Sequence, residues 1–171
     1  MTDRAIQAAW DAVRRTRSRD PARICAEMDI DVLIRQDFEQ QKGAFCVVLG
    51  RPFIFLNGRL SEDEQKTVLA HELGHALLHR DLAEKDVLCE FDLFNMATGV
   101  EYEANVFAAE LLIDPQEMEE CLREGRDIYS AAGALGVNVN LLIIRLAELN
   151  RRGGRYRLPY LPDTGFLGGG A

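Results

Sequence analysis

The feature that most constrains this chain is His71-Glu72-Leu73-Gly74-His75, which lies inside a stretch typical of an α-helix. Ser61-Glu62-Asp63-Glu64 has the pattern of a capping box, and acidic residues in a first turn suit the helix dipole. We therefore expect a helix from about residue 61 to residue 79. On it the two histidines lie one turn and about 40° apart, whereas Leu73 and Leu77 fall on the opposite, apolar side.

Two imidazoles at this spacing can bind one tetrahedral metal ion from the same side. Glu72 is displaced around the helix, where its carboxylate can reach a metal-bound water rather than the metal. This is the H-E-x-x-H arrangement of zinc peptidases. We predict that His71 and His75 are metal ligands and that Glu72 is the catalytic base, with zinc as the expected ion and manganese as the alternative. Two surface histidines on an amphipathic helix are the simpler explanation of the same pattern.

A catalytic zinc site takes three protein ligands, and the chain holds three histidines in all. The third, His79, lies on the same helix, and one straight helix cannot close three sides of a tetrahedron, so a carboxylate is needed. In a second expected helix, about residues 100–113, Glu101 shares the small apolar face, whereas Glu103 falls on the opposite face, where we expect solvent. We select Glu101 as the third ligand, against the alternative of a solvated carboxylate. Asn105, one turn later, is expected to hydrogen-bond a ligating histidine.

Other residues near this site have two explanations each. Tyr102 neighbours Glu101 and either stabilises the oxyanion of a peptide-cleaving reaction or faces solvent. His79 either touches the ligands or is a cation near the helix C-terminus, and the helix dipole favours the second explanation. The apolar residues between Leu88 and Met96 are candidates for a substrate pocket or a lid, and core packing explains them equally well.

Composition narrows the class of protein. A chain of 171 residues with 47% hydrophobic residues suits one compact catalytic domain. A net charge of −8 disfavours broad attraction to nucleic acid or anionic membranes. The sequence has neither an apolar run of membrane-spanning length nor a signal-peptide pattern, so we expect a cytoplasmic protein without membrane contact. The scattered Cys25, Cys46, Cys89 and Cys121 are then expected to be reduced thiols. The sequence leaves the oligomeric state open.

The order of expected elements predicts an α+β fold. Two N-terminal helices precede three strand candidates, residues 30–35, 44–49 and 53–56, and Gly50-Arg51-Pro52 joins the last two. A small antiparallel sheet is expected beside the helix that carries the histidines. Strand 44–49 is a candidate edge on which an extended peptide substrate can pair.

Residues 126–158 are expected to form a helix-turn-helix-like extension, packed on a zincin-like metallopeptidase domain of residues 1–125 and followed by a flexible tail of residues 159–171. The turn Gly136-Val137-Asn138 would join its two helices. The second helix, from Leu141 to Leu149, is largely apolar and few of its side chains can reach a base, so a structural or repressor-docking role is favoured over direct DNA binding. The arginines beside it would attract an acidic or helical partner: Arg151, Arg152, Arg155 and Arg157.

Taken together, segments 71–79 (HELGHALLH) and 101–112 (EYEANVFAAELL) resemble the ImmA/IrrE metallopeptidases. The resemblance extends over about residues 20–150 and implies a gluzincin-like fold whose third ligand is the glutamate four residues before the asparagine, here Glu101. It also implies a protein substrate, since characterised members cleave helix-turn-helix repressors and release mobile-element or stress-response genes. The chain departs from the family's usual Leu-Leu-Met-Pro at Leu111-Leu112-Ile113-Asp114-Pro115, which puts the exit of that helix in question.

The expected function is therefore a zinc-dependent endopeptidase that cleaves a helix-turn-helix transcriptional repressor. The competing class is a regulatory DNA- or protein-binding module whose metal site is structural. Glu72 separates the two, because a structural metal site has no need of a base.

Overall fold

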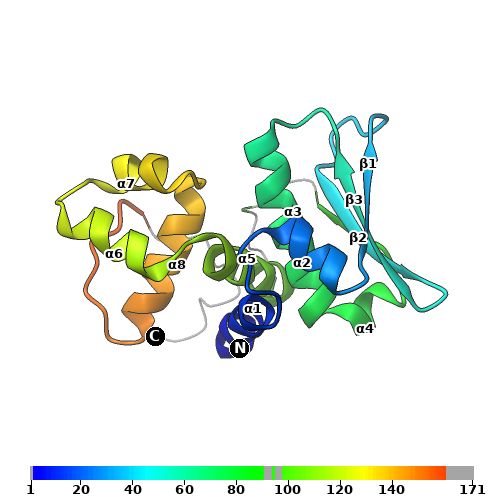
Figure 1. Ribbon diagram of the computed structural model, residues 1–171, viewed down its shortest axis with the longest axis horizontal. Helices are drawn as coiled ribbons and strands as arrows, with labels where there is room; N and C mark the ends of the chain where they lie inside the picture. Colours follow the sequence, from blue (N-terminus) through cyan, green and yellow to red (C-terminus); the bar gives the residue numbers. More distant parts are fainter. Residues whose placement is uncertain (1, 91–93, 95–97, 161–171) are drawn as a thin grey trace.

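The computed structural model describes residues 2–90, 94 and 98–160 (Figure 1). A small sheet and helix α3 form one end of the molecule, α6, α7 and α8 form the other, and α5 and α1 lie between them. In chain order the elements are α1 (Thr2–Thr16), α2 (Pro21–Glu27), β1 (Asp31–Arg35), β2 (Gly43–Val48), β3 (Arg51–Asn57), α3 (Glu62–Leu78), α4 (Arg80–Ala83), β4 (Leu88–Glu90), α5 (Gly99–Leu112), α6 (Pro115–Arg123), α7 (Ile128–Leu135) and α8 (Val139–Arg151). The predicted α+β fold class is confirmed.

The sheet has the strand order β1-β3-β2-β4, and the prediction of an antiparallel sheet is only partly right. Strands β2 and β3 form an antiparallel hairpin whose turn is Leu49-Gly50, both with positive φ (50° and 78°), as a two-residue hairpin turn of type I′ requires. Strand β1, however, pairs with β3 in parallel. After β1 the chain crosses to form β2 two positions away in the sheet. The hairpin then places β3 between β1 and β2.

Strand β2 is not an edge of the sheet, contrary to expectation. Its first residues pair antiparallel with β4, in the register Gly43↔Glu90, Ala44↔Cys89 and Phe45↔Leu88. The backbone amide of Lys42 extends this pairing by donating to the Glu90 carbonyl at 2.7 Å. A three-residue strand in an aperiodic part of the sequence therefore covers the edge on which an external peptide was expected to pair.

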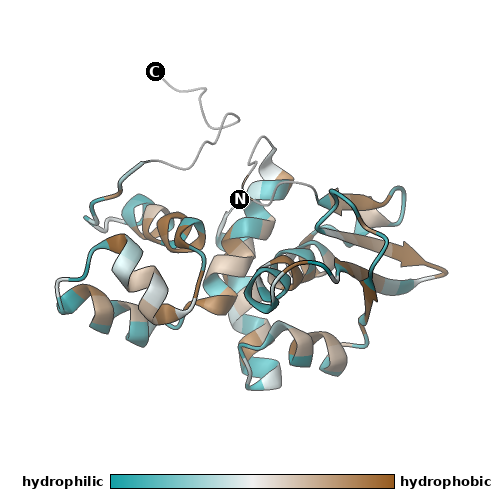
Figure 2. Cartoon of the chain, turned by 90° about the horizontal axis from the view of Figure 1, so that it is seen from above, coloured by the Kyte–Doolittle hydropathy of each residue, from teal (hydrophilic) through white to brown (hydrophobic). Residues whose placement is uncertain are grey.

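Helix α3 is buried on both sides, by the sheet on one and by α5 on the other. Its capping box is present as predicted, with the Ser61 side chain accepting from the Glu64 amide while the Glu64 carboxylate accepts from the Ser61 amide. Gly74 permits the contact with α5, because a Cβ at this position would lie 3.1 Å from both the Cα and the carbonyl oxygen of Ala104. Hydrophobic residues concentrate in the helices and strands, while the connecting loops are largely hydrophilic (Figure 2).

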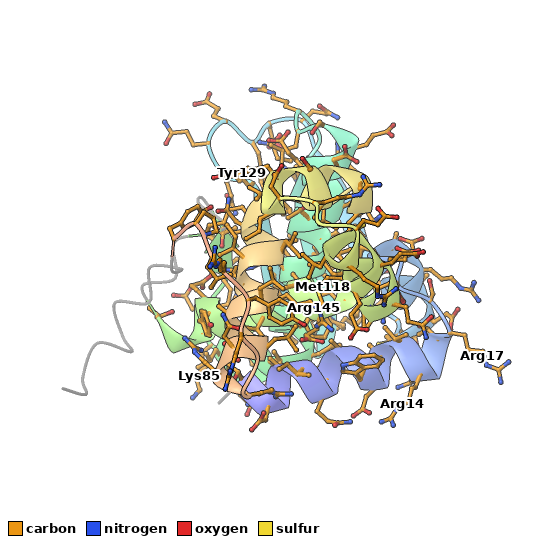
Figure 3. All side chains as sticks on the ribbon, turned by 90° about the vertical axis from the view of Figure 1, so that its left-hand side faces the viewer. Arg14, Arg17, Lys85, Met118, Tyr129 and Arg145 are labelled. Carbon is orange, nitrogen blue, oxygen red and sulfur yellow. The ribbon has the colours of Figure 1, made fainter. Side chains whose placement is uncertain are left out.

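The C-terminal helices have the predicted helix-turn-helix-like shape. Gly136 ends α7 in the left-handed conformation, and α8 continues at 111° to α7. Residues 141–148 of α8 are all buried, and α8 lies against α5 through two polar contacts, Arg145 with Glu110 and Glu148 with Tyr102. Figure 3 shows Arg145 and Met118 within this part of the molecule, whereas Arg14 of α1 and Arg17, in the turn after it, extend outward.

Within the described residues, no single helix combines the length and the apolar character needed to cross a membrane; only α7 and α8 taken together, across their bend, meet that test. The proposed boundary between residues 125 and 126 stays a prediction. Of the expected tail, residues 161–171 lie outside the described residues.

Candidate metal centre

Two elements bring the predicted ligands together. His71 and His75 lie on α3 with their Nε2 atoms 3.0 Å apart, and both rings are buried. From α5, the Glu101 Oε2 atom lies 3.3 Å from the His71 Nε2 and 3.6 Å from the His75 Nε2. All three ligand atoms lie within 4.8 Å of one another. A tetrahedral ion with ligand distances of about 2.0–2.2 Å needs ligand atoms roughly 3.3–3.6 Å apart. The two distances from Glu101 lie in this range, and the 3.0 Å between the histidine nitrogens is about 0.3 Å shorter, so a small rotation of one ring would fit the three side chains to such an ion.

The charges at this cluster favour a cation. Although burial disfavours protonation of His71, the carboxylates of Glu101 and Glu90 raise its pKa to about 10. For Glu101, burial is outweighed by hydrogen bonds from His71 and His75, which hold the pKa of this carboxyl below its usual range. The site therefore retains positive charge between carboxylates in a buried position, which is the electrostatic condition that a divalent metal ion meets.

Glu72 is fully buried, and neither of its carboxylate oxygens has a hydrogen-bond partner among the described residues. Burial raises the pKa of Glu72 to about 8, opposed by His71 and supported by the charges of Glu90 and Glu101. A buried polar group without a partner is costly, so its presence points to a function. Gly43 provides the space, since a Cβ at this position would lie 2.6 Å from the Glu72 Oε1 atom.

Asn105 lies one turn after Glu101, as predicted, and its Oδ1 atom is 3.1 Å from the His71 Nδ1. The amide oxygen is an acceptor, so His71 donates through Nδ1–H. A metal ion that displaces the proton from Nε2 would then find the lone pair of this atom directed at the other ligands.

Glu90, at the end of β4, was not anticipated from the sequence. Its carboxylate is buried, with the Oε2 atom 3.1 Å from the His71 Nε2. No periodic pattern marks residues 80–100, so the sequence has no signal for this placement. Glu90 lines a cavity of about 170 Å³ beside the cluster, together with Glu72, His75, Val87, Leu88, Cys89 and Glu101. Leu88 thus lines the cavity, while Phe91, Leu93 and Met96 of the same apolar stretch lie outside the described residues.

Two predictions from the sequence are wrong: that Glu103 faces solvent, and that His79 acts only as a cation near the helix C-terminus. Glu103 is buried, not solvated, and its Oε2 atom lies 3.1 Å from the His79 Nε2. The other ring nitrogen of His79, Nδ1, lies 3.1 Å from the Nδ1 of His75. The physical reason is that α5 is covered by α1, α3 and α8, which leaves it no solvated face along its middle.

Tyr102 is not placed to stabilise an oxyanion. Its side chain is buried toward α8, where the hydroxyl donates to the Glu148 carboxylate. Burial, followed by this contact with Glu148, raises the pKa of Tyr102 above its usual range.

Comparison with known proteins agrees with this geometry. The model of the IrrE N-terminal-like domain family, Peptidase_M78, matches residues 25–147, a range that includes α3, β4 and α5. "Uncharacterized immunity region protein 2" of Bacillus phage phi105 is 30% identical over 101 residues, which make up 59% of this chain and 63% of that protein. The match thus spans less than two thirds of the length of the phage protein. The resemblance noted from the two motifs is confirmed: the chain belongs to the IrrE N-terminal-like family of peptidases.

Proposed function

We propose that this protein is a zinc-dependent endopeptidase that cleaves a helix-turn-helix transcriptional repressor and so derepresses mobile-element or stress-response genes. The observation that carries the proposal is the Glu72 carboxylate, buried without a hydrogen-bond partner among the described residues and adjacent to the His71–His75–Glu101 cluster. A metal site that only stabilises the fold does not require such a group.

The chemistry follows from where the residues lie. A zinc ion held by His71, His75 and Glu101 would supply Lewis acidity for the scissile carbonyl and for a water molecule. Glu72 accepts a proton from the attacking water at its carboxylate and delivers it to the leaving amine nitrogen. Because no residue that the structure describes forms a hydrogen bond with the Glu72 carboxylate, none of them competes with the water for it. Burial raises the pKa of the Glu72 carboxyl, and a divalent cation bound at the neighbouring ligands would lower it again and keep the carboxylate charged to accept the proton.

A repressor substrate is supported by family membership and by the similarity to a phage protein named for an immunity region. Docking of a folded partner is proposed at the C-terminal arginines. Two of the four are engaged within the chain, Arg151 with Glu148 and Arg152 with Asp3. Arg155 and Arg157 are exposed and form no ion pair within the part of the chain that the structure describes, so these two remain to attract an acidic partner.

The alternative, a regulatory DNA- or protein-binding module with a structural metal, has one feature in its favour, the angle between α7 and α8. A DNA-reading helix needs an exposed face for base contacts, however, and residues 141–148 of α8 are buried. This burial supports a packing role for α8 in place of DNA recognition.

Glu72→Gln tests the proposal directly. The variant keeps the shape of the side chain and removes only its ability to take a proton, so we expect metal content and thermal stability near those of the parent. Cleavage of the repressor should fall by about 10²- to 10⁴-fold. Metal analysis, thermal unfolding and cleavage of a purified helix-turn-helix repressor that the parent enzyme cleaves measure the three properties. Undiminished cleavage by the metal-loaded variant would exclude Glu72 as the base.

A further inference from the structure

Behind the metal cluster, a chain of three side chains leads from a ligand to a buried carboxylate. His75 lies 3.1 Å from His79 through their Nδ1 atoms, and the His79 Nε2 lies 3.1 Å from the Glu103 Oε2. All three side chains are buried. We call this arrangement the His75–His79–Glu103 chain. It uses the third histidine of the sequence and a carboxylate that the proposed reaction leaves without a role.

When His79 is neutral, the hydrogen-bonding capacities of the three groups allow only one arrangement of the protons. A carboxylate only accepts, so His79 must donate to Glu103 through Nε2–H. A neutral imidazole carries one N–H, which leaves the His79 Nδ1 as an acceptor, and His75 must then donate to it through Nδ1–H. The Nε2 of His75 consequently bears its lone pair, and this is the atom 3.6 Å from the Glu101 carboxylate oxygen.

A doubly protonated His79 gives the opposite order. Both of its nitrogens would then donate, the His75 Nδ1 would have to accept, and the proton of His75 would sit on Nε2, where it blocks coordination. With His79 neutral, the Glu103 carboxylate holds the His79 proton on Nε2 and thereby the His75 proton on Nδ1, although no hydrogen bond joins Glu103 to His75 among the described residues. On the other ligand, Asn105 accepts from the His71 Nδ1 and has the same effect in one step.

We propose that His79 and Glu103 are positioning residues for the metal site, which hold the His75 ring in place and keep its proton on Nδ1. The inference rests on the proposed metal site, since it assigns the residues that prepare one of its ligands. It predicts that loss of either residue weakens metal binding even in a fully folded protein.

The experiment measures zinc affinity by competition with a chelator in the full-length chain. His79→Ala and Glu103→Ala should each bind zinc about 10- to 100-fold more weakly than the parent. His79→Asn and Glu103→Gln should recover most of the affinity, because an amide oxygen can accept the hydrogen bond at nearly the same place. The matched control is Glu110→Ala, since Glu110 is also a buried carboxylate of α5 but contacts Arg145 in place of a ligand. That control should lose stability and keep its zinc affinity.

The tautomers provide a second readout that a purely structural role would not produce. In the zinc-loaded parent, imidazole ¹⁵N spectra should place the proton of His75 on Nδ1 and that of His79 on Nε2. A proton on the His79 Nδ1 overturns the proposal, as does unchanged affinity in both alanine variants. Equal weakening in Glu110→Ala overturns it too, because the effect would then be general loosening of α5. A parent that binds no zinc would instead overturn the metal site itself, and with it this inference.

Discussion

At the scale of single residues, the metal centre is built from charged groups whose burial costs free energy. Each of these charges is stabilised only by the opposite charges beside it. Glu72, Glu90 and Glu101 converge on the space beside His71, each carboxylate at least partly buried. Without positive charge between them, these carboxylates repel one another and lose their hydration. The residues most important to the proposed chemistry are thus also those that most require a bound cation.

Glu101→Gln should remove the charged ligand while preserving the shape of the side chain. We expect purified protein to lose stoichiometric zinc but to remain folded, since the Glu101 side chain is 30% exposed and lines the cavity beside the cluster. Metal analysis after dialysis against a weak chelator measures this.

The control for Glu101→Gln is a second buried carboxylate of α5 that does not contact a ligand. From the sequence, Glu103 was the obvious neutral comparison, but its contact with His79 disqualifies it. Glu110→Gln, at a buried carboxylate remote from the ligands, is the suitable comparison and should retain zinc. Equal zinc content in the Glu101 and Glu110 variants would show that another group is the third ligand.

Gly43 leaves room for the Glu72 carboxylate because it has no side chain. A Cβ there would lie 2.6 Å from the Glu72 Oε1 atom and 2.6 Å from the Val68 Cγ1 atom. Gly43→Ala should therefore displace the Glu72 carboxylate, reduce peptide cleavage strongly and cost about 1–3 kcal/mol of stability from overpacking.

Gly133→Ala is the matched control for Gly43→Ala. Gly133 lies in α7, and an added Cβ meets nothing within 4 Å. Alanine should stabilise this helix by about 0.5–1 kcal/mol and leave cleavage unchanged. Urea unfolding and cleavage rates measured on both variants test the pair, and cleavage at the parental rate by Gly43→Ala would contradict the steric argument.

At the scale of elements, the contact between α3 and α5 is what builds the centre. α3 supplies His71, Glu72 and His75, while α5 supplies Glu101 and Asn105, and neither helix holds a complete ligand set. The close approach at Gly74 therefore sets the distance between the histidines and the third ligand.

Gly74→Ala tests this dependence. The new Cβ would lie 3.1 Å from Ala104 backbone atoms, which cannot move aside as the end of a side chain can. We expect the helices to separate slightly, stability to fall by about 1–3 kcal/mol and zinc affinity to fall with it. Titration with zinc and urea unfolding provide the two measurements. Parental affinity in a destabilised variant would mean that the ligand spacing does not depend on this contact.

At the scale of the whole molecule, the C-terminal helices close over α5 on the side away from the sheet (Figure 1). Polar contacts at both ends of α5 accompany this packing: Tyr102 with Glu148, and Glu110 with Arg145. The segment after α8 then presents the two arginines left for a partner.

Replacing Arg155 and Arg157 together by serine should slow repressor cleavage at low salt and reduce its salt dependence, because steering by exposed charges is screened by salt. Hydrolysis of a short peptide that contains the cleaved bond should be unchanged, since these arginines are not part of the metal centre. Replacing Arg14, exposed on α1, and Arg17, exposed in the turn directly after it, is the control for a general change of charge. A double variant with the parental rate and salt dependence on the repressor would exclude this docking surface.

The sequence by itself determined the features that depend on local order along the chain. Helical periodicity and a capping box were enough to define α3, with the two histidines on one face and Glu72 beside them. The same periodicity in α5 placed Glu101 and Asn105 on one face and Glu103 on another. In the structure both Glu101 and Asn105 lie beside His71. The hairpin of β2 and β3 was likewise expected around Gly50, although its turn is Leu49-Gly50 and the other two predicted turn residues, Arg51 and Pro52, belong to β3.

Only the tertiary structure decided what each helix and strand packs against. Glu103 was expected in solvent because a wheel shows the faces of a helix and not how many neighbours cover them. Glu90 reaches His71 by way of a three-residue strand, too short to have a period of its own. The parallel pairing of β1 with β3 depends on how a loop crosses the sheet. In each case the deciding energy comes from burial and hydrogen bonds between segments far apart in the sequence, which local patterns do not encode.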